Sequence, residues 1–85
     1  MDRRALLRRL ARGATQNVPF ADMIDLIEGF GFHLARSRGS HRIFVSPAIP
    51  ELLNLQEVQG QAKPYQIRQF LRLVERHGLQ MEDKP

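Results

Sequence analysis

The chain has 85 residues and a formal net charge of +4, from 13 Lys and Arg against 9 Asp and Glu. That length allows one compact domain and excludes a two-domain enzyme with a cleft between its domains. The chain has no cysteine and no apolar run long enough for a membrane helix or a signal peptide, so we expect a cytoplasmic protein without disulfides, thiolate metal sites or a membrane partner.

Arginine supplies most of the positive charge. Eleven of the 13 cations are arginine, and only Lys63 and Lys84 are lysine. The planar, forked donors of guanidinium match the geometry of phosphate and can stack on bases, which favours nucleic acid as a partner. A modest excess of arginine is also compatible with an ordinary solvated surface. Charge alone therefore leaves both interpretations open.

A short amphipathic helix is expected at the start of the chain, over residues 2–12. Leu6 and Leu10 lie on its apolar stripe, and Gly13 follows as a C-terminal cap. The polar residues after it form a linker. We assign residues 1–16 to this basic helix and its linker.

A second helix is expected to begin near Pro19, because proline is tolerated in the first turn of a helix. Gly31 is expected to end it in a left-handed conformation. Apolar residues between these positions follow the helical spacing i, i+3, i+4, i+7. They are Phe20, Met23, Ile24, Ile27 and Phe30.

The hydrophobic period then changes to that of strands. Three strands are expected where residues alternate or are β-branched and aromatic, over 32–36, 41–45 and 52–58. The glycine-bearing turn Arg38-Gly39-Ser40 joins the first two in a β-hairpin. In the third strand Leu53 and Leu55 face inward, and residues 59–62 are expected to be a loop.

A last helix is expected from Pro64 to Gly78, followed by a charged tail over residues 80–85. Its predicted core face consists of Ile67, Phe70, Leu71 and Val74. The two long helices need a partner layer for their apolar faces. We therefore expect an α+β domain over residues 17–79. Its order α-β-β-β-α matches that of a double-stranded-RNA-binding domain (dsRBD), with a three-stranded antiparallel sheet covered on one face by two helices.

His41 is the candidate catalytic residue. The sequence contains no phosphate-binding loop, and its three histidines lack the spacing of metal ligands. His41 follows the hairpin turn, and imidazole groups exchange protons near neutral pH. Arg36, Arg38 and Arg42 could hold a phosphodiester, and Gly39 would let a substrate backbone come close. The alternative is an exposed strand histidine among solvated arginines.

These residues also carry a resemblance to a known family. Gly31-Phe32, then residues 36–44 with Gly39-Ser40-His41, followed by Pro47, resemble the G-S-H-x-x-F signature of the HicA (YcfA-like) toxin family. Residues 49–56, residues 61–66 and Leu71 are similar to one branch of that family. The resemblance covers residues 18–79.

The resemblance implies an mRNA interferase, a small endoribonuclease with a dsRBD-like fold that a HicB antitoxin neutralises. The functional histidine of the family maps onto His41, with Gly39 and Ser40 shaping its turn. Many members have a second histidine where this chain has Arg42, which leaves the identity of a separate acid open.

On this basis we expect a metal-independent reaction on single-stranded RNA or mRNA, with no cofactor. His41 would act as the base on the ribose 2′-hydroxyl, and Arg38, Arg42 or Lys63 would hold the phosphate, Lys63 because it precedes a helix N-terminus. Two other functions remain open. One is a non-catalytic RNA-binding module of the same fold. The other is an interaction protein whose arginines serve only an acidic partner.

Overall fold

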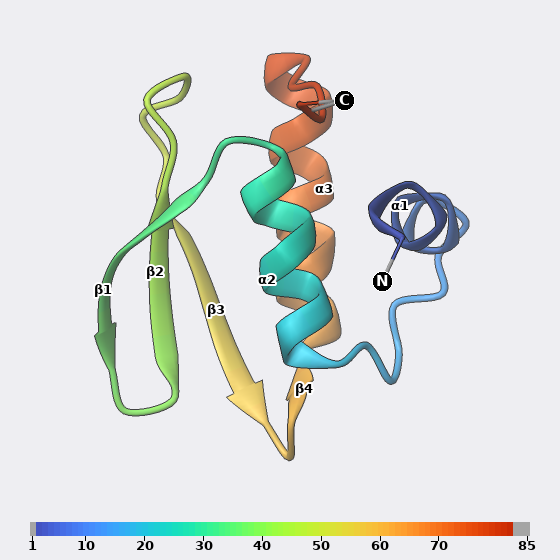
Figure 1. The fold of residues 1–85 in the computed structure, drawn as a ribbon, viewed down its shortest axis with the longest axis vertical. Coiled ribbons are helices and arrows are strands. Elements are labelled where there is room, and N and C mark those ends of the chain that lie inside the picture. The colour runs from blue at the N-terminus through green and yellow to red at the C-terminus, as the bar shows by residue number, and fades with distance from the viewer. Residues whose placement is uncertain (1, 83–85) are drawn as a thin grey trace.

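The computed structural model describes residues 2–82 and confirms the α+β class. Three helices accompany one antiparallel sheet whose strands lie in the order β1-β2-β3-β4. Within the described residues, no helix is both long enough and apolar enough to cross a membrane. The elements are α1 (Arg3–Ala11), α2 (Phe20–Gly29), β1 (His33–Arg38), β2 (His41–Val45), β3 (Leu53–Val58), β4 (Gln61–Ala62) and α3 (Pro64–His77) (Figure 1).

Helix ends lie close to the expected positions. The side chain of Asp2 caps α1 by accepting hydrogen bonds from the backbone amides of the first turn. Pro64 is the first residue of α3, and Gly78 ends that helix in the left-handed conformation with φ 60°. Gly31, with φ 93°, follows α2 in the same way. The predicted start and stop residues therefore bound the two long helices.

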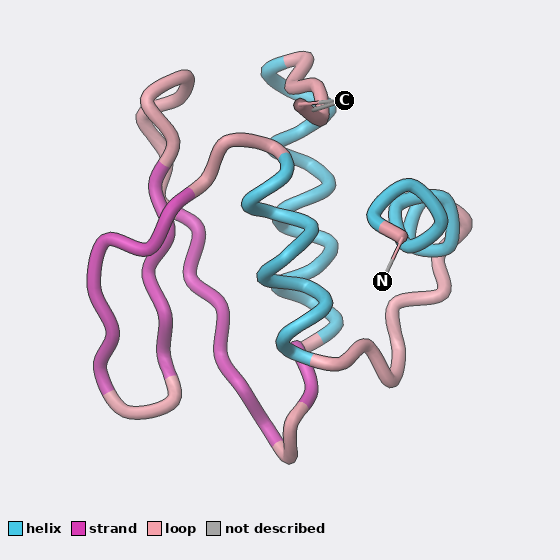
Figure 2. The backbone as a smooth tube through the Cα atoms, viewed as in Figure 1, coloured by secondary structure: helices cyan, strands magenta, loops and turns pink. Residues whose placement is uncertain are grey.

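The helices lie on one face of the sheet. Figure 1 shows α2 and α3 along this face and α1 beyond them, away from the strands. The opposite face carries no helix. The tube in Figure 2 shows that the β1–β2 and β3–β4 turns lie at one end of the sheet, and the longer β2–β3 connection lies at the other end. One broad face of the sheet is thus open to solvent.

The hydrophobic core fills the space between the sheet and the helices. Phe44, Leu53 and Leu55 enter it from the strands and are buried. Phe70 lies at its centre, with its ring edge-on to Phe30 and Phe32 at centroid distances of 5.3 and 6.0 Å. Helices α1, α2 and α3 contribute further buried apolar residues, which are Leu6, Leu10, Phe20, Met23, Leu26, Ile27, Ile67 and Leu73. Leu26 and Leu73 were missing from the predicted helix faces.

The prediction of three strands was wrong, because residues 61–62 form a fourth strand rather than a loop. Glu57 pairs with Ala62, and Val58 pairs with Gln61. A two-residue strand is too short to show alternation in the sequence. The turn before it has positive φ at both central residues, 52° at Gln59 and 77° at Gly60, as a type I′ hairpin requires.

The boundaries of the first strand were also displaced. β1 begins at His33 and continues through Arg38, which had been assigned to the turn. Phe32 precedes the strand and is buried in the core. A register shift between Leu34 and Arg36 leaves Ala35 as an extra residue opposite β2. This bulge interrupts the alternation that strand prediction relies on.

The two ends of the described chain pack against α2. The Arg3 guanidinium binds the Asp25 carboxylate through two hydrogen bonds of 2.9 and 3.2 Å. At the other end, the backbone amide of Glu82 donates to the carbonyl of Gly29 at 2.7 Å. The expected charged tail over 80–85 is therefore ordered through residue 82, and residues 83–85 lie outside the described residues.

Candidate functional site

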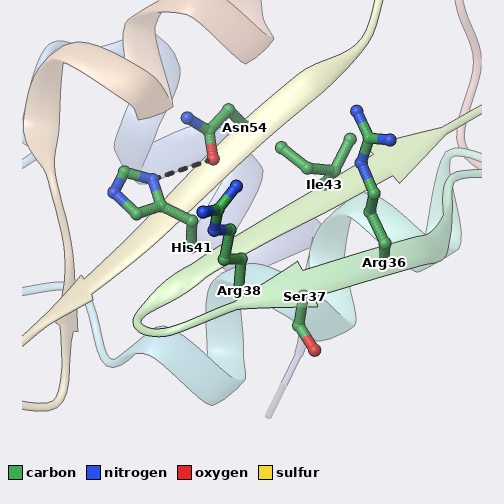
Figure 3. A pocket seen from close by; sticks show the side chains of 6 residues that line it. All are labelled: Arg36, Ser37, Arg38, His41, Ile43 and Asn54. Atoms are coloured by element: carbon green, nitrogen blue, oxygen red, sulfur yellow. Dashed lines mark hydrogen bonds between the residues drawn. The ribbon is translucent and has the colours of Figure 1, made fainter.

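A hollow of about 570 Å³ lies on the open face of the sheet, near the β1–β2 turn. β1 contributes Arg36 and Arg38 to its wall, and β2 contributes His41 and Ile43. Their side chains share one face because residues two apart on a strand point the same way. Ser37 and Asn54 complete the lining (Figure 3).

The β1–β2 turn presents His41 at the start of β2. Arg38 and His41 are paired, so Gly39 and Ser40 form a two-residue turn. Gly39 has φ 59°, which suits the first central position of a type II′ turn, and an added Cβ would meet nothing within 4 Å. The Arg42 guanidinium folds back and donates to the Gly39 carbonyl at 2.8 Å. The turn is therefore stabilised by the pairing of Arg38 with His41 and by the hydrogen bond from the Arg42 side chain.

Asn54 is a polar neighbour of the His41 ring that sequence reasoning missed. Nδ1 of His41 lies 3.3 Å from Oδ1 of Asn54, as Figure 3 shows. Asn54 lies opposite Ile43 in the β2–β3 pairing, between the buried Leu53 and Leu55. A polar residue between two core leucines was a signal that this position faces away from the core. The pairing register needed to place it beside His41 was not available from the sequence.

The residues that line the hollow give it a positive charge. Two of the six are arginine, and none is Asp or Glu. Guanidinium groups donate several hydrogen bonds in a fixed plane and bind phosphate in a bidentate manner. Ile43 adds an apolar surface beside them. The hollow is thus chemically suited to a phosphodiester, and an imidazole is among the groups that line it.

The structure brings together some of the predicted site residues and separates others. Arg36, Arg38 and His41 line the hollow. Arg42 pairs with Leu55 in the sheet and contacts the turn, and it does not line the hollow. Lys63 does not line the hollow: it follows β4 as the N-cap residue of α3, with Nζ 5.7 Å from the centre of the Tyr65 ring.

The other two histidines lie outside the hollow. His33 is exposed on the edge strand β1. His77 Nε2 lies 3.0 Å from Oε2 of Glu51, and this hydrogen bond, with a further one from Arg76, holds the pKa of the Glu51 carboxyl below its usual value. Across residues 2–82, no three His, Cys, Asp or Glu side chains are grouped so that they could hold a metal ion.

No family model, curated protein or solved structure matches this chain. The functional argument therefore depends on the residues and geometry of the hollow.

Proposed function

We propose that this protein is an endoribonuclease that cleaves single-stranded RNA, and mRNA in particular, at the hollow around His41. One observation carries the proposal: an accessible imidazole lies beside the guanidinium of Arg38, and the Arg36 guanidinium lines the same hollow on the uncovered sheet face. The resemblance of Gly39-Ser40-His41 and its flanking residues to the HicA signature supports the same activity. The protein would then act as a toxin that halts growth by destroying transcripts.

The proposed reaction is an internal transesterification. His41 takes the proton of the ribose 2′-hydroxyl, and the 2′-oxygen forms a bond to the neighbouring phosphorus. The bond from phosphorus to the 5′-oxygen breaks, and that oxygen takes a proton from water. The products are a 2′,3′-cyclic phosphate and a 5′-hydroxyl end. This chemistry needs neither a metal ion nor a cofactor.

Arg36 and Arg38 are the proposed phosphate-binding residues. Both line the hollow, and charge accumulates on the phosphoryl oxygens as the 2′-oxygen attacks. Gly39 and Ser40 shape the turn, and Arg42 stabilises it by donating to the Gly39 carbonyl. Lys63 is the N-cap residue of α3 and is not among the residues that line the hollow, so we assign it no contact with the reacting phosphate.

We also propose a fold relationship, from the order of the elements, and a partner protein, from the charge of the open sheet face. The order α2-β1-β2-β3-α3 resembles that of a dsRBD, with β4 as a short addition before α3. A HicB-like antitoxin with an acidic surface would complement the arginines of the open face. By covering that face it would exclude RNA from His41. We therefore place RNA binding and neutralisation on one surface.

The test is RNA cleavage by purified protein in the presence of EDTA. We expect wild-type protein to produce fragments with 2′,3′-cyclic phosphate ends, and His41→Ala to produce none. His33→Ala is the matched control, because His33 is also an exposed strand histidine but lies outside the hollow. RNA that is retarded on a gel but stays intact would instead identify a non-catalytic binding module. Full activity of a folded His41→Ala protein would refute the catalytic assignment.

A further inference from the structure

We propose that Asn54 is a positioning residue that fixes the tautomer and orientation of His41. This inference rests on the proposed nuclease function, because it concerns the base of that reaction. Its starting point is the 3.3 Å contact between Nδ1 of His41 and Oδ1 of Asn54 on the open sheet face. The carboxamide oxygen can only accept a hydrogen bond, so this contact is a hydrogen bond only when Nδ1 carries the proton. A neutral imidazole then has its lone pair on Nε2.

This arrangement matters because only the unprotonated nitrogen can act as a base. Exposed imidazole in water favours the opposite tautomer, with the proton on Nε2. Asn54 therefore reverses the preference and leaves Nε2 free to take the 2′-hydroxyl proton. When His41 becomes doubly protonated, Oδ1 of Asn54 continues to accept from Nδ1. The same contact thus supports the ring before and after proton transfer.

The sheet holds Asn54 firmly in place. Leu53 and Leu55 on either side of it are fully buried, which prevents β3 from rotating about its axis. Ile43 lies opposite Asn54, and His41 lies opposite Gln56, so the amide lies diagonally across the strands from the imidazole. Diagonal neighbours on adjacent strands are close enough for the Asn54 side chain to reach the His41 ring.

The decisive measurement is the tautomer of His41, read from the ¹⁵N chemical shifts of its ring at a pH where it is neutral. In the wild-type protein we expect the proton mainly on Nδ1 at His41, and mainly on Nε2 at His33, for which residues 2–82 supply no such hydrogen-bond acceptor. Asn54→Ala should move His41 to the Nε2–H form. Asn54→Asp keeps an acceptor oxygen and should retain the Nδ1–H form.

Gln56→Ala is the matched control, because Gln56 is the paired neighbour of His41, whereas the side-chain hydrogen bond of the ring goes to Asn54. It should leave the tautomer unchanged. In RNA cleavage, Asn54→Ala should lower kcat about tenfold or more with KM within about twofold, because the base remains but is mostly in the wrong form. A fingerprint spectrum of backbone amides verifies the fold of each variant.

Two outcomes would overturn the proposal. One is a wild-type His41 with its proton on Nε2, and the other is an unchanged tautomer in folded Asn54→Ala. Neither measurement requires RNA, so both are independent of the nuclease activity. A wild-type protein that has the Nδ1–H tautomer but never cleaves RNA would refute the proposed function and leave the positioning of His41 established.

Discussion

The two arginines of the hollow should dominate the salt dependence of RNA binding. Each phosphate that a protein neutralises on a single strand contributes a slope of about −0.7 to a plot of log K against log salt concentration. Arg36 and Arg38 both line the hollow, and each can contact one phosphate. Replacing both by glutamine should therefore reduce the magnitude of the slope by about 1.4.

The experiment uses His41→Ala as the parent, so that the RNA stays intact. Binding of a fluorescent single-stranded RNA is followed by anisotropy between about 50 mM and 200 mM salt. The matched control replaces two exposed arginines by glutamine, Arg8 of α1 and Arg12, which caps the C-terminal end of α1. Both double variants lose the same formal charge, but α1 lies beyond the helices, away from the open sheet face (Figure 1).

An effect of position can thus be separated from an effect of net charge. We expect the Arg36 and Arg38 variant to show the smaller slope, and the α1 variant to retain a slope close to that of the parent. Equal losses in the two variants would mean that binding follows net charge alone. An unchanged slope in the Arg36 and Arg38 variant would remove the hollow as the RNA-binding site.

Two further predictions concern stability. Phe44→Ala should lower the free energy of unfolding by about 3–5 kcal/mol in urea unfolding, because the ring is only 1% exposed. His41→Ala, three positions earlier on the same strand, should change this free energy by less than about 1 kcal/mol. Equal losses in the two variants would contradict the assignment of Phe44 and His41 to opposite faces of the sheet. The hydrogen bonds from Arg3 lower the pKa of Asp25, so this pair stabilises the fold above the ordinary carboxyl pKa of about 4 and loses its contribution as the pH falls through the lower pKa of the folded state. The Arg3 and Asp25 side chains are 36% and 44% exposed, so Asp25→Asn should lower the free energy of unfolding by about 0.5–1 kcal/mol at neutral pH and leave it unchanged in strong acid. A loss of stability that persists in acid would exclude the ion pair as its cause.

The sequence was sufficient to predict the helices and strands that bury one apolar face in the core. Spacings of three and four residues located α2 and α3, and proline and glycine marked their ends. Alternation in β3 correctly placed Leu53 and Leu55 in the core. These features are predictable because burial imposes the period of each element on its apolar residues.

The site was only partly predictable, because its contacts depend on pairing between strands. The two-residue turn Gly39-Ser40 fixes the register of β1 with β2 and pairs Arg38 with His41, whereas the turn expected from the sequence included Arg38. β2 and β3 are joined by residues 46–52, an irregular connection whose length does not determine register. The contact between His41 and Asn54 depends on that register.

One face of β2 therefore contributes to the hydrophobic core, and the other face carries the residues of the proposed reaction. Phe44 points into the core, and His41 and Ile43 line the hollow on the other side. A shift of one residue in register would exchange these faces and bury the imidazole. The two-residue turn before His41 prevents that shift, because its left-handed glycine matches the twist of the hairpin. Gly39 thus acts on the site through geometry, by determining which side of the sheet His41 occupies.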